Sequence, residues 1–201
     1  MLVEGKKDGN GINVKTKNIT YCTPGMYENA LATAGIKDAD IVVAGPFNIS
    51  GTAALVGAIK SYENMTGEKV NTENVETATN ELVITGQVAE SVGDQEKAEQ
   101  LIGAIKEQVV EGEAVTTEEI ENVVEQAAQE MKIELSEEDR QAIVSLMEKI
   151  DDLDLDIESL KEQAKNLYDK IASLDLDLNI DGEQVKGFFQ KIVDFFKGLF
   201  E

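Results

Sequence analysis

The chain has 201 residues, of which 42% are apolar and 5% aromatic, and its 18 basic residues stand against 40 acidic ones. This apolar content is sufficient for a core built mainly from aliphatic side chains, so the composition excludes a disordered chain. The net charge of −22 repels phosphate backbones, and we therefore expect no nucleic-acid partner.

Two residue types narrow the possible chemistry. The sequence has no histidine and a single cysteine, Cys22, which excludes an internal disulfide, histidine-activated nucleophiles and the common zinc sites. An enzyme of this composition would depend on a carboxylate pair, a lysine or a hard metal ion. The sequence has no run of eighteen apolar residues and no signal-peptide core near Met1, so we predict neither a membrane span nor a leader in the chain as given.

Charge divides the sequence near Gly67. Residues 1–66 contain six lysines and six acids, whereas residues 67–201 contain 12 basic and 34 acidic residues and so carry the whole net charge. Small and β-branched residues dominate the first region, and apolar residues at helical spacing dominate the second. The predicted fold class is α+β: a small βαβα unit at 1–67, followed by an acidic, mostly helical region at 68–201.

The first region begins with strand and helix patterns. Apolar and polar residues alternate over 12–21, which predicts one or two half-buried strands. Thr23 and Pro24 provide a helix cap and a first helical residue, and the helical spacing that follows ends at Gly35. We therefore predict a strand followed by a helix.

A second strand and helix complete this unit. The apolar run at 41–44 predicts a short buried strand that Gly45–Pro46 ends, and small residues at helical spacing predict a helix from about 52 to 62. So small a sheet leaves its edges exposed. We therefore expect a further strand, a partner or the acidic region to cover them.

The second region is predicted to consist of helices with explicit start signals. Thr116 with Glu119 forms a capping box, and Ser136 with Asp139 is nearly the same motif. Acids near helix starts are favourable because the helix dipole is positive there. The predicted helices span residues 73–91, 94–110, 117–132, 137–150, 157–172 and 182–200.

The turn after the second strand is the first candidate site. Ser50, Gly51 and Thr52 lie between a strand and a helix, where backbone N–H groups can bind an anion. The turn lacks the lysine of a phosphate-binding loop. We favour a connecting loop in which Ser50 or Thr52 caps the helix.

An acidic run near the C-terminus is the second candidate. Oxygen-bearing side chains alternate at Asp177, Asn179 and Asp181, with Glu183 after a glycine, as at the start of a calcium loop. The twelfth position, where a bidentate glutamate should close the shell, is Phe188. We favour a structural turn and assign no cofactor, with calcium as the alternative.

The last predicted helix carries an apolar face. Phe188, Ile192, Phe196 and Phe200 lie on that face, which must be buried against something. It could pack within the molecule, bind a protein partner, mediate self-association or lie on a membrane surface. Because its polar face is not basic, we favour packing or self-association over a membrane.

Parts of the chain are similar to a known family. The segments involved are Asn18–Thr20, Met26–Ile36, Val43–Phe47, Ser50–Leu55, Tyr62–Glu63 and Gly67. They closely resemble the YpuA-like family of secreted bacterial and archaeal proteins, described as a domain of unknown function, and the acidic helices look similar as well. The resemblance implies an extracytoplasmic, cell-envelope setting and no established activity or catalytic residues. Members of that family start with a signal peptide and further sequence before the equivalent of Gly9, so we expect this chain to be a fragment or a shortened member.

The sequence therefore favours one function and leaves two others open. We expect a non-enzymatic interaction or scaffold module outside the cytoplasm. The alternative is a module that binds a cation or small ligand at the acidic run or the 45–52 turn. The second alternative is a carboxylate-based hydrolase of envelope glycans, for which no acid pair can be recognised from spacing.

Overall fold

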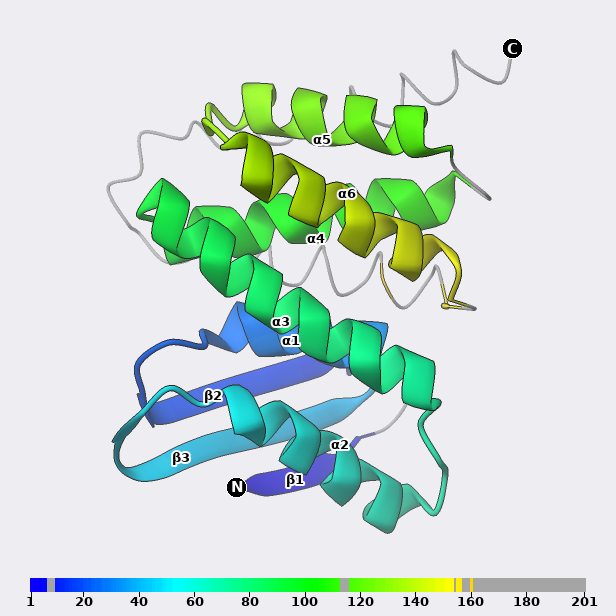
Figure 1. Cartoon of the computed structure of the whole chain (residues 1–201). Coiled ribbons are helices and arrows are strands. Elements are labelled where there is room, and N and C mark those ends of the chain that lie inside the picture. The colour runs from blue at the N-terminus through cyan, green and yellow to red at the C-terminus, as the bar shows by residue number, and fades with distance from the viewer. Residues whose placement is uncertain (7–9, 113–115, 154, 157–159, 161–201) are drawn as a thin grey trace.

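The computed structural model describes residues 1–6, 10–112, 116–153, 155–156 and 160, and it confirms the α+β class (Figure 1). The predicted helix at 182–200, and all of the one at 157–172 except Leu160, lie outside the described residues. The elements, in chain order, are β1 (Leu2–Gly5), β2 (Ile12–Ile19), α1 (Pro24–Thr33), β3 (Ala39–Ile49), α2 (Thr52–Thr66), α3 (Thr72–Val92), α4 (Gln95–Glu111), α5 (Thr117–Glu130) and α6 (Glu137–Asp151).

The sheet has three strands in the order β1-β3-β2. Strands β2 and β3 are parallel and α1 connects them, whereas β1 pairs with β3 in the antiparallel direction. In this register Val42 of β3 lies between Leu2 of β1 and Lys15 of β2. Strand β1 is the additional strand that the small predicted sheet required.

Strand β3 is longer than the sequence indicates. The prediction that Gly45–Pro46 ends it is wrong, because β3 continues to Ile49 and pairs there with Ile19. Pro46 is tolerated because β1 pairs with β3 only up to Val42, so no neighbouring strand on that side requires its missing N–H. Asn18, with a φ of 59°, interrupts the β2 register and donates from Nδ2 to the Gly45 carbonyl at 2.8 Å.

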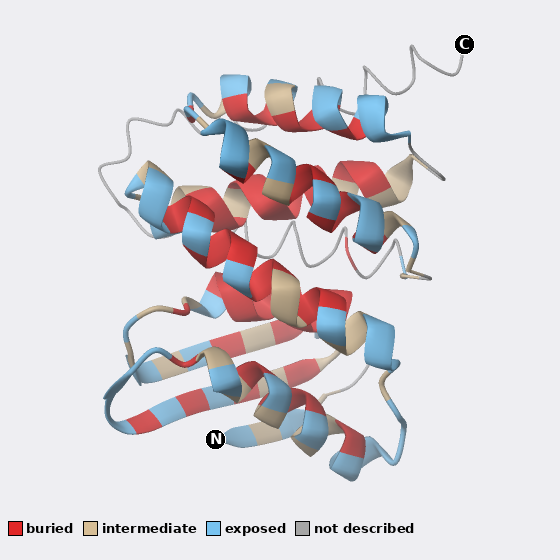
Figure 2. Cartoon of the chain, viewed as in Figure 1, coloured by how far each residue is buried: buried red, intermediate tan, exposed pale blue. Residues whose placement is uncertain are grey.

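Helices α1 and α2 pack on the same face of the sheet and form the first hydrophobic core. Strand residues that point toward these helices are buried and alternate with exposed ones, as the colouring of β2 and β3 shows (Figure 2). Tyr27 of α1 crosses this core and donates its hydroxyl to the Gly51 carbonyl at 2.6 Å. The core also includes Ala78 and Leu82 of α3, so apolar packing continues past Gly67.

Helices α3 to α6 form the second hydrophobic core, with α3 running between the sheet unit and the other helices (Figure 1). The predicted helix limits differ from the observed ones by at most two residues in all four helices. The start signals explain this agreement. Thr116 and Glu119 form the predicted capping box, and Ser136 accepts from the Asp139 N–H at 3.1 Å.

The division of the chain into units at residue 67 stays a prediction, and substitutions on α3 test it. Leu82→Ala removes a buried side chain from the first core and should lower the free energy of unfolding by about 2–5 kcal/mol. Because α3 contributes to both cores, we expect a single unfolding transition in denaturant, followed by fluorescence and circular dichroism. Val83→Ala, at an exposed position of the same helix, is the control and should change the stability by about 0.5 kcal/mol or less. Two separate transitions, with only one shifted by Leu82→Ala, would instead support independent units.

Candidate functional site

One face of the sheet is not covered by any helix in the described part of the chain. We call it the open face. Its side chains alternate along the strands with those of the first core and are exposed or half-buried (Figure 2). The open face consists of Leu2 and Glu4 on β1, Asn13, Lys15 and Lys17 on β2, and Asp40, Val42 and Ala44 on β3.

In the register of the three strands, the open face has an apolar centre and two charged ends. Leu2 and Val42 are 64% and 37% exposed and lie side by side. At one end, Lys6 forms salt bridges of 3.0 Å to Glu4 and 3.1 Å to Asp40, and because one lysine faces two carboxylates this end stays negative. The hydrogen bond from Lys6 is the main cause that holds the pKa of Asp40 below its usual value. The other end is positive.

Lys15 and Lys17 form this positive end. Both are exposed, and neither has a salt bridge to any residue in the described part of the chain. Lys15 lies next to Val42 in the register, so the positive charge borders directly on the apolar centre. Exposed apolar surface beside uncompensated lysines is a distinctive patch on a chain with a net charge of −22.

The strand edges beside this face are protected. Val14 of β2 donates its backbone N–H to Oε1 of the buried Glu28 at 2.9 Å, so a carboxylate from α1 occupies a place that a further strand would take. On the other side, Pro46 lies in the part of β3 that extends beyond β1. Proline and inward-facing charges are common devices against strand pairing at sheet edges. The open face is therefore a better contact surface than the strand edges.

The Ser50–Thr52 turn is held by contacts to the first core. Gly51, with a φ of 93°, is the N-cap of α2 and no side chain caps this helix, so the expectation that Ser50 or Thr52 would do so is wrong. A side chain at Gly51 would collide with the Tyr27 hydroxyl, which is why glycine takes the cap position. The Ser50 carbonyl accepts from the Cys22 N–H at 3.1 Å. Anion binding at this turn stays a prediction.

A buried ion pair joins α1, α3 and α4. Lys106 of α4 is 4% exposed and Glu81 of α3 is fully buried, with 2.8 Å between the ammonium and a carboxylate oxygen. The ammonium also donates to the Asn29 carbonyl at 2.8 Å and to the Thr33 hydroxyl at 3.1 Å, both on α1. The Thr33 hydroxyl in turn donates to Glu81. Each charged group thus has several partners, as a buried charge requires.

A second buried acid lies nearby on α4. Glu99 is 4% exposed and accepts a hydrogen bond from the hydroxyl of Thr23, the N-cap of α1. Its backbone carbonyl accepts from Asn29 Nδ2 at 2.9 Å. Burial is the main cause that raises the pKa of Glu99 to about 7. Charge on this side chain is therefore variable near neutral pH.

Neither buried charged group was recognised from the sequence. Glu99, Ile102 and Lys106 fall at helical spacing on one side of α4, in phase with the apolar stripe that includes Ile105 and Val109. That spacing was the available signal, because a charged residue inside an apolar stripe must be buried or interrupt the stripe.

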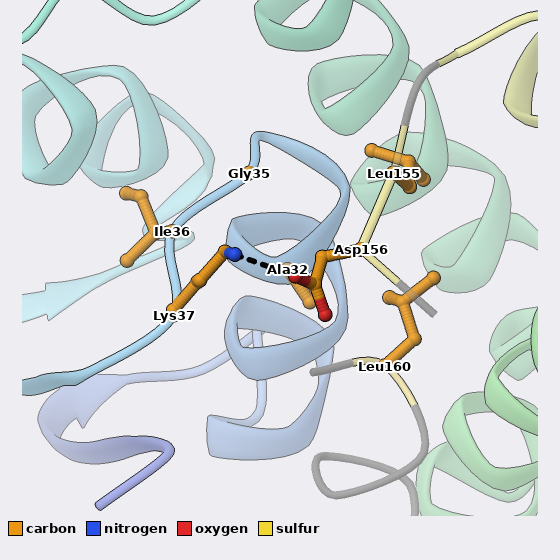
Figure 3. A pocket seen from close by; sticks show the side chains of 7 residues that line it. All are labelled: Ala32, Gly35, Ile36, Lys37, Leu155, Asp156 and Leu160. Atoms are coloured by element: carbon orange, nitrogen blue, oxygen red, sulfur yellow. Dashed lines mark hydrogen bonds and ion pairs between the residues drawn. The ribbon is translucent and has the colours of Figure 1, made fainter. Parts of the chain in front are cut away.

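A cavity of about 320 Å³ lies between the C-terminal end of α1 and the segment that follows α6 (Figure 3). Ala32, Ile36 and Leu160 supply apolar wall, and Lys37 pairs with Asp156 at 2.6 Å. Leu160 belongs to the first core, so this contact ties the segment after α6 back to the sheet unit. The Lys37–Asp156 pair fixes one side of the cavity (Figure 3).

Metal-binding side chains do not cluster in the described ranges. No group of three or more carboxylates or thiols that could hold a metal ion occurs among those residues. A cavity of about 290 Å³ between α3 and α6 is lined by Glu73, Glu76 and Asp152 together with Lys149. The predicted calcium residues Asp177, Asn179, Asp181 and Glu183, and the predicted partner-binding residues Phe188, Ile192, Phe196 and Phe200, lie outside the described residues.

Comparisons with known proteins place the chain in a family. Residues 1–167 match the family described as "Protein of unknown function (DUF1002)", and the chain belongs to this family. It is also similar to a protein of Bacillus subtilis (strain 168) named "Uncharacterized protein YpuA", with 39% identity over 158 residues. This alignment covers 78% of the chain but 54% of that relative, so the chain spans about half the relative's length. The resemblance to YpuA-like proteins is thereby confirmed, and no solved structure matches.

The helices give one further finding about membranes. Among the described residues, none of the helices is both long enough and apolar enough to cross a bilayer.

Lys106→Met provides a test of the buried ion pair. The substitution leaves the Glu81 carboxylate buried without its cation, which should lower the free energy of unfolding by about 3–5 kcal/mol. The double variant Lys106→Met/Glu81→Met removes both charges and should recover much of that loss in urea denaturation. A double variant no more stable than Lys106→Met would contradict the view that the unpaired carboxylate is the cause.

Proposed function

We propose that this protein is a non-enzymatic interaction module that binds a partner protein on the open face of its sheet. The observation that carries the proposal is a parallel strand pair of which the described helices cover only one face. Strands β2 and β3 are parallel, and parallel strands in proteins normally have both faces buried. Here α1 and α2 cover one face only, so the other is suited to a second layer supplied by a partner.

The chemistry of the open face indicates what kind of partner fits. Its centre, Leu2 with Val42, favours apolar side chains, and Lys15 with Lys17 at its border favours carboxylates. An amphipathic segment with an apolar stripe and an acidic flank satisfies both requirements. Electrostatic complementarity of this kind fixes orientation and accelerates association.

A different protein fits this description better than a second copy of the chain. The described helices α3 to α6 are acidic and amphipathic, but their apolar stripes are already buried in the two cores. In α5, for example, Ile120, Val123, Val124 and Ala127 are all buried in the second core. Within the described residues, a folded second copy therefore offers acidic surface without the apolar stripe that the open face requires. Self-association through the Phe-rich C-terminal segment stays a separate prediction.

The proposed setting is the cell envelope. Its support is the resemblance of residues 18–63 to a family of secreted proteins. Such a module would act as a scaffold component outside the cytoplasm, where one partner is held by the sheet.

Charge reversal on the open face tests the proposal. A photo-reactive amino acid at Val42 would cross-link the bound partner in the native host, and mass spectrometry would identify it. The purified partner is then titrated against the wild-type chain and against Lys15→Glu/Lys17→Glu. We expect the double variant to weaken affinity on the order of tenfold or more, with a weaker salt dependence, because attraction becomes repulsion.

The matched control reverses two lysines elsewhere. Lys69→Glu/Lys132→Glu changes the net charge equally at exposed positions outside the open face and should leave the affinity near the wild-type value. Equal losses in the two double variants would show a general charge effect. That result, or the absence of any cross-link from Val42, would overturn the proposal.

Cation binding is the second candidate, favoured by the alternating oxygen ligands from Asp177 to Glu183. On this alternative, calcium titrated into the full chain gives binding heat in a calorimeter, and Asp177→Ala and Asp181→Ala each abolish it. Glu118→Gln, an exposed acid of α5, serves as the control and should retain the heat. A titration without heat for the wild-type chain would exclude this candidate.

A further inference from the structure

Glu99 projects from α4 into the start of α1. Its carboxyl group accepts from the hydroxyl of Thr23, and the same hydroxyl accepts from the Met26 N–H at 3.1 Å to cap α1. One threonine thus connects the first turn of α1 to the side chain of α4. The Glu99 carbonyl adds a second connection through Asn29 Nδ2.

Gly25 makes room for this carboxyl group. A Cβ atom at Gly25 would lie 2.5 Å from Cδ and from Oε1 of Glu99, closer than such atoms approach one another. The carboxyl group therefore occupies the space that a side chain in the first turn of α1 would fill. Its position is fixed by packing from both helices, and the side chain has little room to turn toward water.

The charges around Glu99 oppose its ionisation. After burial, the groups that raise its pKa are Glu28 on α1 and Glu96 on α4, both acidic, whereas the hydrogen bonds from Thr23 and from the Met26 backbone lower it. Lys106 is already paired with Glu81, the buried acid of α3, so its ammonium group is not available to Glu99. The net result is a pKa of about 7.

We propose that Glu99 makes the junction between α1 and α4 sensitive to pH: the neutral acid holds the two helices together, and the carboxylate loosens them. An ionised Glu99 is a buried charge facing two other acids, and it reaches water only when the start of α1 separates from α4. Local opening of the junction therefore becomes more frequent as the pH rises through the pKa of Glu99. This inference does not depend on the proposed partner.

The direction of the pH effect follows from the linkage between proton binding at Glu99 and opening of the junction. The pKa of Glu99 is higher in the closed junction than in an open one, where an ordinary value near 4.5 applies. The closed form therefore binds more protons between these two values, so its stability falls as the pH rises through that range and levels off above about 7. Between pH 6 and pH 8 the opening equilibrium should increase about tenfold.

Hydrogen exchange tests the proposal in the full chain. The probes are the amides in the first turns of α1 and α4, with rates corrected for the intrinsic pH dependence of exchange. We expect their protection to fall about tenfold from pH 6 to pH 8 in the wild-type protein. In Glu99→Gln, which keeps the shape and the Thr23 acceptor but has no charge, protection should not change. Glu118→Gln, an exposed acid on α5, is the control and should behave as the wild type.

A second variant guards against misfolding of the first. Gly25→Ala places a methyl group where the carboxyl group lies, so it should reduce protection at both pH values and remove the difference between them. Carbon-13 NMR of the Glu99 carboxyl should show titration near pH 7. The proposal is overturned by an ordinary carboxyl pKa in that spectrum, or by a tenfold change that persists in Glu99→Gln or Gly25→Ala.

Discussion

Helix α3 is the constraint on which both halves of the described structure depend. Its first turns place Ala78 and Leu82 in the core beneath the sheet, and its later turns place Ile84 and Val88 in the core of the helices. Glu81, one residue before Leu82 on the same helix, binds Lys106. Apolar packing is not directional, whereas one ammonium that donates to three acceptors on two helices fixes how they are aligned. We interpret the buried pair as the contact that sets the register of α1, α3 and α4, with apolar surface supplying most of the stability.

Local signals explain which features were predictable from the sequence. The helix limits after residue 67 followed from caps and glycines, because the Thr116 capping box and the Gly93 stop act within one turn. Strand β3 was not predictable in the same way, since Pro46 ends strands in most settings and is tolerated here only because β1 is short. Buried charge was missed for a related reason. Glu81, the partner that allows Lys106 to be buried, is 25 residues away in sequence, and no local sequence pattern indicates this pairing.

The open face is a second feature that local sequence patterns could not predict. Alternation in β2 correctly indicated a half-buried strand, but alternation alone does not say whether the polar face meets water or another layer. The parallel pairing of β2 with β3 is what indicates a missing second layer, because parallel strands normally have both faces covered. Which strands pair is a tertiary property that a local pattern does not contain. The calcium-like run and the Phe-rich segment remain predictions from the sequence, since both lie outside the described residues.

In the proposed function, charge asymmetry gives the open face its selectivity. The helical region carries the net negative charge and repels an acidic partner over its surface, whereas Lys15 and Lys17 attract the same partner to the sheet. Glu28 and Pro46 protect the strand edges, so an arriving segment gains little from pairing its backbone with the sheet. A ligand recognised in this way must instead present side chains to Leu2 and Val42. The proposed function therefore favours a partner that lies across the strands with its own secondary structure already formed, such as a helix, over an extended peptide.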